Sequence, residues 1–84
     1  MQSYLVEAYL ARATPAELEE LANRARLVVK AMRAEGLRVR YIRSTFLPQD
    51  ETCLHVFQGA SEATVGEAAR RARLAAHRIV EAVE

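Results

Sequence analysis

The chain lacks most of the sequence features that would indicate a function. It has one cysteine in 84 residues, which excludes an internal disulfide framework and suits a reducing compartment. Residues 1–4 contain no basic region followed by an apolar run, so the sequence predicts neither a signal peptide nor a membrane span. We therefore expect a cytoplasmic protein that has no membrane partner.

Motifs for catalysis and for nucleic-acid binding are also missing. The sequence contains no glycine-rich phosphate loop and no nucleophile elbow. Residues 52–57, which we expect to form a strand, do not match the aromatic pattern of RNA-recognition modules, and residues 10–14 hold no Cys-x-x-Cys metal loop. The net charge of +1 provides no general attraction to nucleic acid. The missing motifs favour a binding protein over an enzyme without deciding between them, and we expect no nucleic-acid partner.

The composition is that of one small globular domain, residues 1–84, with 51% hydrophobic and 27% charged residues. A core of this size supplies about 3–5 kcal/mol of net stability. Association with another chain is a common way to increase it.

Local signals divide the chain into strands and helices. Residues 4–9 are apolar and partly aromatic, as strands are. Thr14, Pro15 and Glu17 form a capping box with proline at the first helical position, and Gly36 marks the end of that helix. The basic residues Arg24, Arg26, Lys30 and Arg33 are interpreted as the solvated side of this amphipathic helix.

The second half of the chain predicts a strand over residues 37–46, a Pro/Asp turn, a strand over 52–57 and a helix capped by Ser61. Residues 73–83 are open to two interpretations, because nothing between 70 and 82 breaks a helix while Ile79, Val80 and Val83 favour a strand. With a last strand the order is βαββαβ. This order is the ferredoxin-like α+β fold, a four-stranded antiparallel sheet with two helices on one face.

Side chains alternate along strands, so each strand has a helix-facing side and an open side. On the open side we expect Leu5, Glu7, Tyr9, Arg40, Ile42, Ser44, Phe46, Cys53, His55, Phe57, Ile79, Glu81 and Val83. On the helix-facing side we expect Tyr4, Val6, Ala8, Val39, Tyr41, Arg43, Leu54 and Val56. The open side would be too apolar for a free monomer, so we predict a homodimer that joins two sheets into a dimeric α/β barrel.

The sharpest chemical feature is the Cys53-x-His55 pair, because a thiolate and an imidazole are good ligands for nickel, zinc or copper. Alone, each residue is more often a core filler than a ligand. Glu7 and Glu81 could add oxygen ligands, and doubling across a dimer axis would complete a site. We expect nickel or zinc, with Cys53, His55, Glu7 and Glu81 as the metal ligands and no organic cofactor.

A second hypothesis is a dimeric barrel that binds or transforms a small organic molecule in its inter-sheet cavity. Glu7, Tyr9 and Ser44, with His55, would then be the polar groups of the pocket. A third possibility is an interaction module whose open side docks on another protein.

Several segments resemble a bacterial family of small nickel-binding proteins. The resemblance covers nearly the whole chain, and its most specific part is Pro48-x-Asp50-Glu51-Thr52-Cys53. The other matching segments are Tyr4-Leu5-Val6-Glu7, Tyr41-x-x-Ser44, the strand end at Phe57, and Arg78-Ile79-Val80-Glu81-Ala82. The resemblance implies a ferredoxin-like fold, a dimer of the α/β-barrel type and a last strand.

The chain departs from the family pattern at three places. Residues 73–76 replace a Gly-x-Pro-like break, which would let the second helix run longer. His77 stands where an acidic residue is commoner, and His55 stands where the strand often has another residue. The metal ligands of the family are therefore not transferred to individual positions of this chain.

Overall fold

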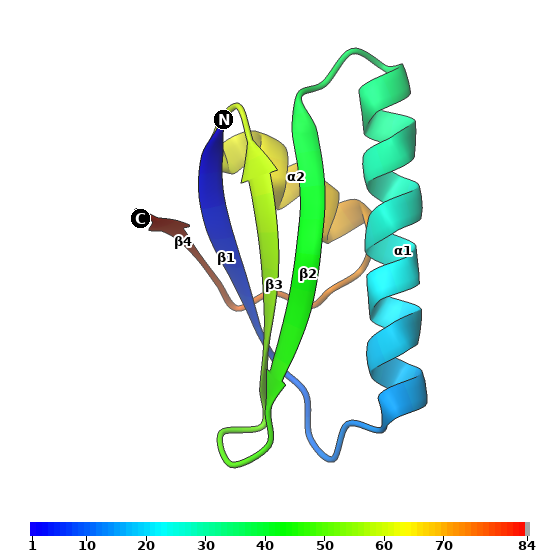
Figure 1. The fold of residues 1–84 in the computed structure, drawn as a ribbon, viewed down its shortest axis with the longest axis vertical. Helices are drawn as coiled ribbons and strands as arrows, with labels where there is room; N and C mark the ends of the chain where they lie inside the picture. Colours follow the sequence, from blue (N-terminus) through cyan, green and yellow to red (C-terminus); the bar gives the residue numbers. More distant parts are fainter. Residues whose placement is uncertain (84) are drawn as a thin grey trace.

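The computed structural model describes residues 1–83, and it confirms the βαββαβ order and the ferredoxin-like fold (Figure 1). The elements are β1 (Gln2–Tyr9), α1 (Pro15–Ala34), β2 (Val39–Leu47), β3 (Thr52–Gly59), α2 (Glu62–Arg71) and β4 (Arg78–Ala82). Within the described residues, no helix is both long and apolar enough to cross a membrane.

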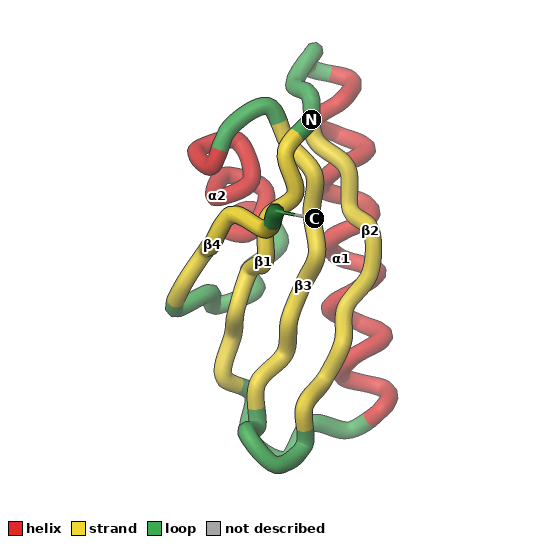
Figure 2. Tube along the Cα trace, turned by 60° about the vertical axis from the view of Figure 1, so that its left-hand side comes forward, coloured by secondary structure: helices red, strands yellow, loops and turns green. Residues whose placement is uncertain are grey.

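The four strands form one antiparallel sheet in the order β2-β3-β1-β4. Both helices lie on the same side of it, and Figure 2 shows the sheet from the other side, which no helix of residues 1–83 covers. Between helices and sheet lies the core, whose fully buried large side chains include Phe57, Met32, Val6 and Val65. The open face of the predicted fold is therefore real, although its composition differs from the prediction.

The predicted ends of α1 are confirmed. The Thr14 hydroxyl accepts a hydrogen bond from the Glu17 amide (3.2 Å), and the Glu17 carboxylate accepts one from the Thr14 amide (3.0 Å). At the other end Gly36 has φ of 91°, a left-handed conformation that glycine adopts without steric cost. The capping box and the terminal glycine therefore define the residues at which α1 begins and ends.

The chain after α2 turns into a strand without the glycine that such a turn favours. Arg73 and Ala75 have φ of 54° and 53°, which costs about 1–2 kcal/mol for a residue with a Cβ. Two interactions offset this cost: Leu74 is buried, and the Arg24 guanidinium donates to the carbonyls of Ala72 (2.8 Å) and Arg73 (2.7 Å). The question left open by the sequence is thus resolved in favour of a last strand.

The predicted faces of β3 are wrong. Val6 and Ala8 are buried under the helices, as expected, and their antiparallel partners are His55 and Cys53. Paired residues in an antiparallel sheet point to the same side, so the imidazole and the thiol lie beneath the helices. Phe57 is buried there as well. The aliphatic Leu54 and Val56, which were expected under the helices, instead face the open side.

The predicted faces of β2 are right at one end and wrong at the other. Val39 is buried as expected, and Tyr41 is paired with Phe57. The register then shifts between Tyr41 and Arg43, which indicates a β-bulge. Beyond the bulge the alternation is inverted. Ser44 and Phe46 pair with His55 and Cys53 on the helix side, while Arg43 pairs with Val56 on the open side.

The predicted faces of β4 are also inverted. Ile79 pairs with Val6 and packs against the core, and Glu81 pairs with Tyr4 on the helix side, where it is exposed at the sheet edge. Val83 follows the strand and is 85% exposed. The apolar centre of the open face consists of Leu5, as predicted, together with Leu54, Val56 and Val80, which were not predicted there.

Candidate functional site

A chain of four polar side chains runs across β2 and β3 on the helix side of the sheet. The Tyr41 and Ser44 hydroxyls are 2.7 Å apart, and the Ser44 hydroxyl is 2.6 Å from Nδ1 of His55. The Cys53 thiol lies 3.8 Å from the same nitrogen. Because a strand places residues i and i+3 on opposite sides, Tyr41 can meet Ser44 only through the bulge between them.

His55 is fully buried in this chain of contacts, with 0% exposure. Burial disfavours the charged imidazolium and lowers the pKa of His55 from 6.5 to about 4. Its Nε2 has no hydrogen-bond partner among residues 1–83. A buried polar atom without a partner costs about 1–3 kcal/mol. The buried imidazole is thus neutral, and its contact with Ser44 at Nδ1 orients it. The unpaired Nε2 makes this arrangement costly in folding free energy.

The Cys53 thiol is also fully buried, and burial raises its pKa. The reactive form of cysteine is the thiolate. A raised pKa and an enclosed position therefore make this thiol a poor nucleophile in the folded chain. It borders a hollow of about 260 Å³ between β1, α1 and the segment after α2.

The four predicted metal ligands do not come together. Cys53 and His55 are in contact under the helices, but Glu7 lies on the open face, where its carboxylate is 3.3 Å from the Arg78 guanidinium. Glu81 lies at the β4 edge on the helix side. In residues 1–83 no three His, Cys, Asp or Glu side chains are grouped so that they could hold a metal ion.

A metal therefore does not fit the buried pair as it stands. The imidazole does have one property of a metal ligand, since Nδ1 is held by a partner while Nε2 is left without one. The thiol, however, lies beside the occupied Nδ1, and it would have to be deprotonated to bind. The described residues provide no third donor.

The residues predicted for an organic-ligand pocket are also separated. Ser44 is bonded to His55 under the helices, Glu7 is paired with Arg78 on the open face, and Tyr9 is 61% exposed with its hydroxyl 3.4 Å from Glu51. They do not line a common space. The hypothesis of a pocket built from these three side chains thus has no support in a single chain.

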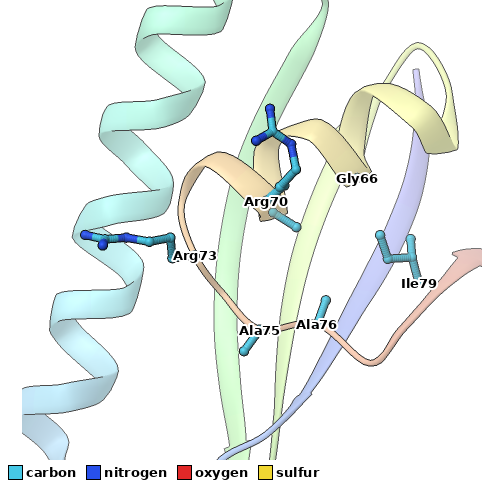
Figure 3. A pocket seen from close by; sticks show the side chains of 7 residues that line it. Gly66, Arg70, Arg73, Ala75, Ala76 and Ile79 are labelled. Carbon is cyan, nitrogen blue, oxygen red and sulfur yellow. The ribbon is translucent and has the colours of Figure 1, made fainter.

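A larger hollow, of about 460 Å³, lies between α2 and β4 (Figure 3). Gly66, Ala75, Ala76 and Ile79 form most of its lining. Arg73 at its rim extends toward α1, away from Ile79, and Arg70 is bonded to Glu67 at 2.6 Å. This hollow is therefore a small-residue crevice without convergent polar groups.

Burial of a neutral His55 predicts a pH-dependent stability. The unfolded chain protonates this imidazole near pH 6.5, whereas the folded chain does so only near its pKa of about 4. The unfolded state therefore binds more protons as the pH falls, and stability should decrease from pH 6.5 toward 4, by up to about 3 kcal/mol. Urea unfolding measured at intervals from pH 6.5 to 5 tests this.

In the same experiment His55→Phe should remove most of the decrease between pH 6.5 and 5, while His77→Gln, in the exposed segment before β4, should retain it. A decrease that survives in His55→Phe would contradict the assignment.

Comparisons with known proteins agree with this fold. A family model described as nickel responsive protein SCO4226-like matches residues 4–82. The crystal structure of SCO4226 from Streptomyces coelicolor A3(2) superposes with a TM-score of 0.77 at 20% sequence identity, covering 98% of this chain and 96% of that one. A search of curated proteins finds no match. The chain belongs to the SCO4226-like family of nickel responsive proteins.

Proposed function

We propose that the protein is a small homodimer that binds nickel or a similar transition metal, and that it serves the nickel response by binding rather than by catalysis. The observation that carries this proposal is the family match over residues 4–82, since the family is described as nickel responsive. The identity of the physiological metal and the dimer are parts of the proposal.

The open face supports the homodimer. Leu5, Leu54, Val56 and Val80 form a continuous apolar centre on neighbouring strands, and neither of the two described helices covers them. An uncovered apolar sheet face favours association. A second copy is the simplest cover, because a face that packs on itself closes the assembly after two chains.

The metal donors are best sought on accessible surfaces. Cys53 and His55 are enclosed, so a metal could reach them only if the helix layer opened. Glu81 on β4 is exposed, and the Glu7 side chain on β1 is 20% exposed. The exposed His77 donates its amide to the Glu7 carbonyl at 2.9 Å. These donors do not converge within one chain. Our proposal therefore requires that the two chains of the dimer complete the site.

Nickel titration by calorimetry tests the metal proposal. The full chain should take up nickel in a stoichiometric ratio, with zinc as the comparison metal. Glu7→Gln, Glu81→Gln and His77→Gln remove accessible donors, and loss of a true ligand should weaken binding by at least about tenfold, since even outer-shell partners have effects of that size.

Cys53→Ser and His55→Phe are the matched variants at the enclosed pair, and they should leave uptake unchanged. Loss of uptake in these two alone would place the metal at the buried pair instead. Absence of nickel binding by the unaltered chain would refute the metal proposal.

The dimer can be tested separately by sedimentation equilibrium. Leu54→Lys places a charge at the centre of the open face, and we expect it to convert a dimer into a folded monomer. Leu27→Lys makes the same change on the 69% exposed surface of α1 and should leave the dimer intact. A monomeric unaltered chain, or equal effects of both variants, would contradict this interface.

A further inference from the structure

Five of the chain's 12 Lys and Arg residues line one groove. The groove runs between α1 and β2, which lie side by side in Figure 1. Spacings of four and three residues place the α1 members on one side of the helix. The five basic residues are Arg26, Lys30 and Arg33 from α1, Arg40 from β2, and Arg38 just before β2.

Four of these residues line one hollow of about 410 Å³, whose lining consists of Arg26, Val29, Lys30, Arg33, Arg40 and Tyr41. An adjoining hollow of about 360 Å³ shares Arg33 and Arg40 with it and adds Arg38. In the part of the chain that the structure describes, no acidic side chain lines either hollow.

The charges of this groove are not balanced within the fold. Over residues 1–83 the ion pairs involve Arg24, Arg70, Arg71 and Arg78, and none of these lies in the groove. Even Glu35, directly after α1, is bound to Arg71 at 2.7 Å. Like charges held together oppose folding, and a cleft of one sign concentrates its potential. A ligand with several negative charges would offset this repulsion.

We propose that the groove between α1 and β2 binds an oligophosphate, either inorganic triphosphate or the triphosphate of a nucleotide. The planar guanidinium groups of Arg26, Arg33 and Arg40 can hold phosphate oxygens in pairs, while Lys30 adds a point charge. A multiply charged, compact anion matches four cations around one hollow. This site goes beyond nickel binding and uses none of the residues proposed for the metal or for the dimer interface.

A single-stranded nucleic acid would require an aromatic surface on which bases can stack. The one aromatic ring in the groove, Tyr41, is packed edge-on against Phe57, with ring centroids 5.4 Å apart. The Arg26 guanidinium covers it at 5.4 Å from the ring centroid, and its hydroxyl is bonded to Ser44. This ring is already engaged, which favours the small anion.

Calorimetric titration of the full chain with sodium triphosphate, ATP and orthophosphate, all in EDTA and at low salt, tests the site. Triphosphate should bind at least about tenfold more tightly than orthophosphate, since each charged hydrogen bond is worth that much. If ATP binds with the same affinity as triphosphate, the site recognises the phosphates alone. If ATP binds more tightly, the site recognises a nucleotide. Absence of triphosphate binding, or tighter binding of a single-stranded oligonucleotide, would overturn the proposal.

Lys30→Gln and Arg40→Gln should each weaken triphosphate binding by about tenfold. Both should keep or raise the Tm, because each relieves repulsion between like charges. Arg12→Gln makes the same charge change at an exposed position in the loop before α1 and should have no effect on binding. Equal weakening by all three substitutions would refute a localised site.

Nickel uptake should be unchanged by Lys30→Gln and Arg40→Gln, so the two proposals can fail independently.

Discussion

The pairing of β3 with β1 determines which side chains of β3 are buried beneath the helices. Val6 and Ala8 are buried against the helices, and antiparallel pairing commits His55 and Cys53 to the same side. A shift of one residue would exchange every side chain of β3 between the two faces. The observed register buries a thiol and an imidazole and leaves Leu54 and Val56 on the open side. The composition of both faces of the sheet therefore depends on this register.

The bulge in β2 is the second condition for the buried polar chain. It brings Ser44 to the helix side, where the hydroxyl holds Nδ1 of His55 at 2.6 Å. Without that partner Nδ1 would be left with the weak contact to the Cys53 thiol at 3.8 Å, and Nε2 has no partner among residues 1–83. The four polar groups are thus most simply understood as a core arrangement that fixes the strand register. The binding surfaces that we propose are then the open face, for a second copy of the chain, and the basic groove, for an oligophosphate.

The sequence predicts those parts of the fold that depend on local signals. The capping box at Thr14, the terminal Gly36 and the alternation of β1 are all confirmed. The predicted faces of β3 were wrong because both alternating sets of its side chains are partly apolar. Alternation separates these two sets but does not show which one is buried. The bulge in β2 was missed because neither glycine nor proline marks it. The basic groove was missed because its members come from two elements, and only the tertiary fold places them side by side.

The most direct test of the β3 register is the accessibility of the Cys53 thiol to a disulfide reagent such as dithionitrobenzoate. A dimer interface could also protect this thiol, so the measurement is made in the monomeric Leu54→Lys chain. Ala63→Cys in a Cys53→Ser background provides an exposed thiol on α2 as the reactive control. If Cys53 lies beneath the helices, it should react only when the chain is unfolded in denaturant. Rapid labelling of Cys53 in the folded monomer would contradict the account.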